Sequence, residues 1–209
     1  MVEMWKGNGT MSADDAFNAV MTFSENHRFE NCKIKYDVID ALIRQPHTTA
    51  TLPFRINTTQ QNIFAVDYDL GRNGYAYFDT DTANYQQNTQ NFGQWNNGWN
   101  YRNDGVDIEN CTDTDTTCGY HVGWIDDGEW LQYTINSDSA AAYELSIRTA
   151  SPEDAVIHLE VNGKVASPPI AIPKTGSWET WSTTSAPNII LPRGEAAVKI
   201  VFDKGGLNF

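Results

Sequence analysis

The sequence has few basic residues, few cysteines and no long apolar run. Its 209 residues include 14 Lys+Arg against 27 Asp+Glu, which gives a formal net charge of −13. Affinity for nucleic acids depends on Lys and Arg side chains that neutralise phosphates, so this balance argues against a nucleic-acid partner. No run approaches the roughly 18 apolar residues that a membrane-spanning helix needs, and no membrane partner is expected.

The N-terminus and the cysteines bear on the compartment. The first ten residues, MVEMWKGNGT, lack the basic start and the apolar stretch of a signal peptide, so we expect an intracellular protein or a mature or excised piece. Cys111 and Cys118 flank a polar loop that a disulfide would close, which favours an oxidising compartment. Three unrelated thiols, with Cys32 as the third, explain the pattern too. No CxxC pair or His spacing indicates a structural zinc site.

Two short helices are expected in the first fifty residues. Ser12 is an N-cap candidate for a helix over about 13–26, where apolar residues recur at helical spacing. A second helix starts after Asp37 and stops near Gln45, because Pro46 follows. Two such helices cannot bury a core of their own. Residues 1–52 are therefore interpreted as a helical segment and linker, which packs on the next domain or belongs to something larger upstream.

From residue 53 to residue 209 the pattern is that of β-strands. Apolar and polar residues alternate over 143–148, 155–161 and 198–202. Asn162-Gly163 predicts a tight hairpin, and Asp127-Gly128 predicts a second one that joins 121–125 to 130–135. Short strands at regular spacing, with no helical period between them, indicate an all-β domain, an antiparallel β-sandwich of the jelly-roll kind.

The acidic residues of this domain admit two kinds of chemistry. Glycoside hydrolysis needs two carboxylates about 5–10 Å apart, and four acidic residues of the loops are available: Glu109, Asp126, Asp127 and Glu129. Turn chemistry explains Asp127-Gly128 better. Clustered carboxylates also suit Ca²⁺, as at Asp79 and Asp81 or at Asp113 and Asp115. Solvated turns explain these pairs equally well, so the metal ligands stay unknown.

Aromatic residues in polar loops are the sharper feature. Trp124 follows Gly123 beside a turn, and Trp178 ends the loop sequence TGSW. Trp95 and Trp99 lie in NFGQWNNGWN, where no strand period would bury both. A sugar ring stacks its apolar face on an aromatic plane while its hydroxyls bond to amides and carboxylates. Among the four histidines, His121 opens a strand near the acidic loop, whereas the others are expected to be solvated.

The stretch GYHVGWIDDGEWLQYTI (119–135) resembles family 6 of the carbohydrate-binding modules. YRNDGVDIE (101–109), AYELSIRTAS (142–151), TGSWETWST (175–183) and IVFDKGGLN (200–208) extend the likeness over about 53–209. These modules are non-catalytic β-sandwiches attached to secreted polysaccharide-degrading enzymes. The resemblance implies a sugar clamped by Trp124 and Trp178 and hydrogen-bonded by Asn208, with Glu129 as a further polar contact. Trp95 and Trp99 would form a second contact surface or fold over the sandwich.

The chain departs from the family in the stretch that should hold calcium. The family places a Glu-x-Glu pair, part of a structural Ca²⁺ site, on its first strand, where this sequence has Phe64 and Val66. A structural Ca²⁺ is therefore an open expectation. Residues 1–50, through ENCKIKYDVIDALIRQ, more faintly resemble the closing helices of a family 5 glycoside hydrolase barrel. That likeness implies the tail of a longer secreted hydrolase, whose catalytic carboxylates lie outside this chain.

The resemblance predicts a monomeric, extracellular, non-enzymatic module that binds a β-glucan or a xylan and keeps an attached hydrolase near its substrate. Two alternatives from other classes stay open. One is a glycoside hydrolase that acts through the acidic loops. The other is a Ca²⁺-dependent adhesion or interaction domain in which Trp95 and Trp99 meet a protein.

Overall fold

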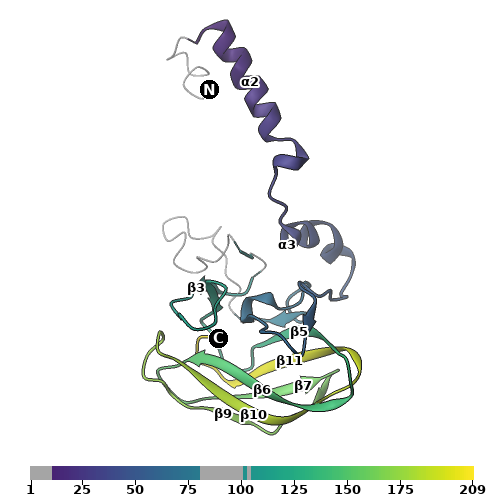
Figure 1. The fold of residues 1–209 in the computed structure, drawn as a ribbon, viewed down its shortest axis with the longest axis vertical. Coiled ribbons are helices and arrows are strands. Elements are labelled where there is room, and N and C mark those ends of the chain that lie inside the picture. Colours follow the sequence, from purple (N-terminus) through teal and green to yellow (C-terminus); the bar gives the residue numbers. More distant parts are fainter. Residues whose placement is uncertain (1–10, 81–100, 103–104) are drawn as a thin grey trace. The chain divides into compact units, whose positions relative to one another are not determined.

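The structure is a computed structural model that describes residues 11–80, 101–102 and 105–209. The chain divides into two compact units, Met1–Lys35 and Tyr36–Phe209 (Figure 1). The predicted boundary at residues 52 and 53 falls inside the second unit. In the part of the chain that the structure describes, no helix has the length and apolar character needed to span a bilayer.

The first unit consists mainly of helix α2, Ala13–Asn26, followed by the 3-10 turn η1, Phe29–Asn31. Its start confirms the sequence prediction. Ser12 has extended backbone angles, and its hydroxyl accepts a hydrogen bond from the Asp15 backbone N–H at 3.0 Å. This bond satisfies one of the N–H groups that a helix leaves unpaired at its first turn.

The second unit begins with the other predicted helix, which is irregular. It runs through α3, Tyr36–Ile39, a π-helical turn η2, Asp40–Arg44, and a 3-10 turn η3, Gln45–His47. Pro46 lies in the last of these turns, where its fixed φ is tolerated. Arg44 donates to Asp40 Oδ2 within the segment at 2.8 Å, and its bond to the Leu70 carbonyl at 3.3 Å joins the segment to the rest of the unit.

The remainder confirms the predicted β-sandwich, whose long strands β6 and β10 lie side by side in Figure 1. One sheet has the order β1-β5-β11-β7-β8, with β2 on β5 and β9 on β7; the others are β10-β6 and β3-β4. All pairs are antiparallel except β1 with β5. The elements are β1 Asn57–Thr58, η4 Ala65–Asp67, β2 Tyr77–Phe78, β3 Ile108–Asn110, β4 Tyr120–Val122, β5 Trp130–Ser137, β6 Ala141–Ala150, β7 Ala155–Val161, β8 Lys164–Val165, β9 Ile170–Ile172, β10 Trp181–Leu191 and β11 Gly194–Lys204.

The core follows the alternation seen in the sequence. In β7 the side chains of Ala155, Ile157 and Leu159 are buried, while the residues between them are partly exposed. Strand β11 repeats the pattern through Val198, Ile200 and Phe202. Because successive side chains of a strand point to opposite faces, one face of each strand supplies the core.

One predicted hairpin is confirmed and one is wrong. Asn162 and Gly163 adopt φ of 51° and 73° and connect β7 to β8. Asp127-Gly128 also forms a turn, with φ of 87° at Gly128, but β4 pairs with β3 whereas β5 pairs with β11. The 123–129 segment instead connects two sheets, and the Gly128 N–H donates to the Phe202 carbonyl at 2.7 Å. Turn residues fix a bend, but they do not choose the strand that pairs.

The three cysteines are free thiols in the structure, so Cys111 and Cys118 are not joined. The backbone closes the loop between them, because the Cys111 N–H donates to the Gly119 carbonyl at 2.9 Å.

Candidate functional site

Two tryptophans stand out on the surface of the sandwich unit. Trp124 is 50% exposed and Trp178 is 47% exposed, although such large apolar side chains are usually buried. Trp124 also has a φ of 47°, in the left-handed region that costs a residue with a Cβ about 1–3 kcal/mol. The hydrogen bonds of its neighbours hold it there: Gly123 N–H donates to the Asp107 carbonyl at 3.0 Å, and Gly206 N–H to the Ile125 carbonyl at 2.8 Å.

Asn208 connects the two tryptophan loops. Asn208 is buried, with 4% of its surface exposed, and its backbone exchanges two hydrogen bonds with Ala150 at the end of β6, at 2.7 and 3.0 Å. The Nδ2 group donates to the Trp178 carbonyl at 2.9 Å. Its Oδ1 lies 3.3 Å from the point that a Cβ on Gly123 would occupy, directly before Trp124. The structure thus brings together the three predicted residues Trp124, Trp178 and Asn208, which we call the clamp.

A carboxylate lies beside the clamp that the sequence did not assign to it. Glu109 Oε1 is 3.0 Å from the same point above Gly123, so a glycine there leaves room for two polar oxygens. Burial, and then repulsion from Glu179, raises the pKa of Glu109 above its usual range. The sequence offered Glu109 only as one of four possible catalytic carboxylates. Its place at the clamp follows from the pairing of β3 with β4, which sequence patterning did not show.

Glu129, predicted as a further sugar contact, has a different role. Its side chain is 5% exposed, and Oε1 accepts bonds from the Thr80 N–H and hydroxyl, both at 2.8 Å. Oε2 accepts from the Asp126 N–H at 3.1 Å. Because both carboxylate oxygens are engaged inside the protein, Glu129 stabilises the 126–129 turn and we do not retain it as a sugar contact. Trp95 and Trp99 lie outside the described residues.

The stretch that holds calcium in the resembling family lacks the family's pair of carboxylates here. The side chains of Phe64 and Val66 carry no oxygen, and Val66 is fully buried in the core. Asp113, a candidate from the acidic loop, is bound to Arg148 instead. Within residues 11–80, 101–102 and 105–209, no cluster of three or more His, Cys, Asp or Glu is arranged to hold a metal. These residues therefore do not fit a structural Ca²⁺ at this place.

The Asp113–Arg148 pair gives a stability prediction. Arg148 Nε and Nη2 donate to the two Asp113 oxygens at 2.7 and 2.9 Å, and this bonding lowers the pKa of Asp113. A depressed carboxyl pKa contributes stability above the pKa of the unfolded state, and that stability is lost as the pH falls through the folded pKa. Asp113→Asn is expected to lower the free energy of unfolding at pH 7 by about 1–2 kcal/mol. In urea titrations the difference should begin to shrink below about pH 4 and close only as the pH falls through the lower pKa of the folded state; a difference that acid does not shrink would contradict the assignment.

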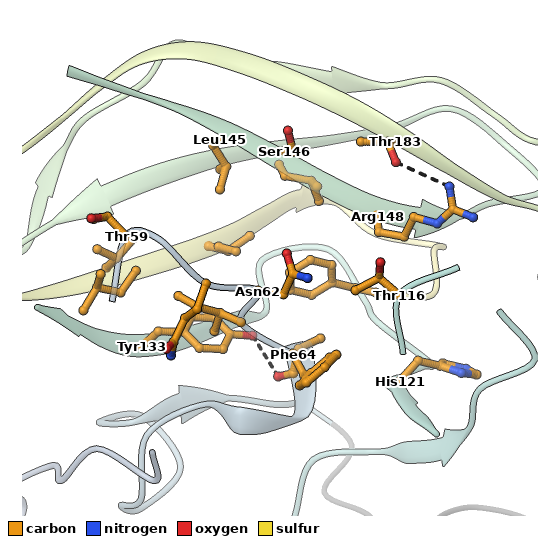
Figure 2. A pocket seen from close by; sticks show the side chains of 18 of the residues that line it. Thr59, Asn62, Phe64, Thr116, His121, Tyr133, Leu145, Ser146, Arg148 and Thr183 are labelled. Carbon is orange, nitrogen blue, oxygen red and sulfur yellow. Dashed lines mark hydrogen bonds between the residues drawn. The ribbon is translucent and has the colours of Figure 1, made fainter. Parts of the chain in front are cut away.

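A cavity of about 430 Å³ lies between the sheets. Figure 2 shows Leu145 and Ser146 on one side of it and Tyr133 and Phe64 on the other. Its interior is lined by apolar strand residues, and polar side chains such as Thr59 line other parts of it. None of the clamp residues lines this cavity, so the clamp and the cavity are separate features.

Comparison with known proteins supports the resemblance. The model of the family described as "Carbohydrate binding module (family 6)" matches residues 97–209, more than half of the chain. A curated relative, the β-agarase AgaA of Microbulbifer thermotolerans, is 29% identical over 97 residues, 44% of this chain and 22% of the agarase. The chain therefore matches only about a fifth of that relative's length.

Two solved structures are also similar to this chain. One is a family 6 module from Clostridium stercorarium in complex with cellobiose, at 19% identity and a TM-score of 0.51, covering 74% of this chain and 92% of that one. It supports the fold. The other is a module of lichenase 5A from Cellvibrio mixtus in complex with cellotriose, at 35% identity and a TM-score of 0.44, covering 49% of this chain and 80% of that one.

Proposed function

The chain belongs to family 6 of the carbohydrate-binding modules, a family of non-catalytic modules, and on that premise we propose that residues 53–209 bind a β-linked polysaccharide, a β-glucan or a xylan. The observation that carries the proposal is the clamp. Trp124 and Trp178 are both half-exposed, and Asn208 lies between their loops: its amide donates to the Trp178 backbone carbonyl, and its Oδ1 lies beside Gly123. An amide side chain can both donate and accept. The apolar faces of a sugar ring between the two indoles would be removed from water, and the amide would replace water as a hydrogen-bond partner of the sugar hydroxyls.

Binding should be weak for a single site. An open clamp offers a few stacked rings and hydrogen bonds that compete with water, so we expect a Kd of about 10⁻³ to 10⁻⁵ M. Such an affinity suits a module that keeps an attached enzyme near a polymer with many equivalent sites, because each release is followed by rapid rebinding.

We further propose that the module serves a longer, extracellular glycoside hydrolase. The β-agarase relative supports this, because the stretch it shares with this chain is a small part of a polysaccharide-degrading enzyme. The faint likeness of residues 1–50 to a family 5 barrel agrees with the same arrangement. The alternative of a hydrolase within the acidic loops draws no support from Glu129, whose carboxylate is engaged by Thr80 and Asp126.

Affinity electrophoresis of the whole chain tests the proposal. The gels would contain cellulosic, mixed-linkage, β-1,3-linked or xylan polymers, and agarose would be added because of the agarase relative. We expect retardation by at least one polymer, relieved by its free oligosaccharide and unchanged by a chelator. Mobility that no polymer alters would overturn the proposal. Release of reducing sugar by the pure chain would instead favour the hydrolase alternative.

A further inference from the structure

His121 is a buried histidine whose ring nitrogens are not used in the hydrogen bonding of the described fold. It lies on β4 with a side-chain exposure of 2%, and within the described residues neither ring nitrogen has a hydrogen-bond partner. Its ring packs edge-on against Trp181, with the ring centroids 5.3 Å apart. Leaving a buried polar group unpaired costs about 1–3 kcal/mol, so such a group requires an explanation.

The His121 ring lies close to the polar side chains at the clamp. The register of β3 and β4 places His121 opposite Glu109, and its Nε2 is 3.9 Å from Glu109 Oε1, too far for a hydrogen bond. The same Nε2 is 3.7 Å from the point above Gly123 that Glu109 Oε1 and Asn208 Oδ1 also approach. A small movement of the Glu109 carboxylate would therefore take it away from the clamp and bring it within hydrogen-bonding distance of the His121 ring.

The charged groups near His121 show how this movement of Glu109 depends on protonation. Glu109 on β3 faces the ring at 3.9 Å, and Glu179, held by the Thr112 hydroxyl, raises the pKa of both groups. Burial is the larger effect on each: it lowers the pKa of His121 and raises that of Glu109. His121 also lines one end of the inter-sheet cavity, away from Thr59 in Figure 2. The other titratable or charged groups of that lining are Cys111, Asp113, Asp115, Tyr120, Tyr133, Tyr143, Glu144 and Arg148.

We propose that His121 is a positioning residue beneath the clamp: its neutral ring leaves the Glu109 carboxylate free to accept a sugar hydroxyl, and its protonation draws that carboxylate away from the sugar. The inference rests on the proposed function. At neutral pH the ring is uncharged and makes no bond to Glu109. A proton taken up from solvent gives Nε2 a charged donor, which pairs strongly with a carboxylate at hydrogen-bonding distance. Sugar binding and ring protonation then oppose each other.

The direct test is the pH dependence of affinity, measured by calorimetry with an oligosaccharide of whichever polymer retards the chain. For the unaltered protein we expect Kd to rise about tenfold between pH 7 and pH 5, which is ~1.4 kcal/mol. His121→Gln keeps the size and hydrogen-bonding capacity but takes up no proton, so its Kd should rise less over this range. Glu109→Gln should bind more weakly at pH 7 and with little pH dependence. A profile unchanged in His121→Gln would overturn the inference.

A second test uses the unaltered chain, so its result does not depend on whether a variant folds well. Because linkage is reciprocal, a saturating sugar should lower the pKa of His121, followed by NMR of its ring protons. The same shift should be absent in Glu109→Gln. A His121 pKa that the sugar leaves unchanged would show that the ring only packs against Trp181. Sugar that binds at no pH would refute the proposed function instead, so the two failures are distinguishable.

Discussion

Trp178→Ala is expected to abolish measurable sugar binding while leaving the fold intact. The indole is 47% exposed, so its removal opens little of the core and the Tm should change by only a few degrees. The same face supplies stacking area for a ring, and losing such an anchor costs about 2 kcal/mol or more. For a ligand of weak affinity, the roughly thirtyfold loss in Kd moves binding beyond calorimetric detection.

The matched control is Tyr75→Ala. Tyr75 is 48% exposed, close to the value for Trp178, but it lies in the turn before β2 and is not part of the clamp. Trp124→Ala should behave as Trp178→Ala does. If a double Trp124→Ala, Trp178→Ala variant still bound the sugar, the site would lie elsewhere on the chain.

Gly205→Ala should have the largest effect on stability. A Cβ at this position would lie 2.8 Å from the carbonyl carbon of Asp126 and 2.9 Å from that of Ile125, which are backbone atoms that cannot rotate away. The adjacent Gly206 N–H donates to the Ile125 carbonyl at 2.8 Å, so the clash falls where the Trp124 loop meets the segment that leads to Asn208. We expect a loss of about 3 kcal/mol or more, and a Tm lower by about 6–12 °C.

Gly163→Ala provides the comparison for Gly205→Ala. Gly163 has a φ of 73° and nothing within 4 Å of its Cβ position, so alanine there suffers only backbone strain of about 1–2 kcal/mol. It should keep full sugar binding, whereas Gly205→Ala should weaken it by displacing the segment beside Trp124. Equal Tm values for the two variants, measured by scanning calorimetry, would contradict the packing described at Gly205.

The sequence predicted local structure well because local chemistry determined it. The helix at Ala13–Asn26 follows from its Ser12 cap, and the strands around Asn162-Gly163 follow from alternation and turn residues. The hairpin predicted at Asp127-Gly128 was wrong because β5, the strand after this turn, pairs with β11, which is far along the chain. The hydrogen-bond partners of a carboxylate also depend on distant segments, since Thr80, which donates to Glu129, lies far from it in the sequence.

The residues of the candidate site also fall into those that the local sequence identifies and those that depend on distant segments. Trp124 and Trp178 could be found from the sequence because large aromatic residues in polar loops are conspicuous without any knowledge of their neighbours. Glu109 and His121 could not be assigned to the clamp, because their meeting requires the register of β3 against β4. The residue types were visible, but the distance between them was not.

The most direct test of the account is the response of the tryptophan indole N–H signals to sugar, followed by NMR on the whole chain. All seven tryptophans, including Trp95 and Trp99, report in one spectrum. The account predicts that the oligosaccharide shifts the signals of Trp124 and Trp178 most, together with the side-chain amide of Asn208. A sugar that binds but leaves these three signals in place would contradict it.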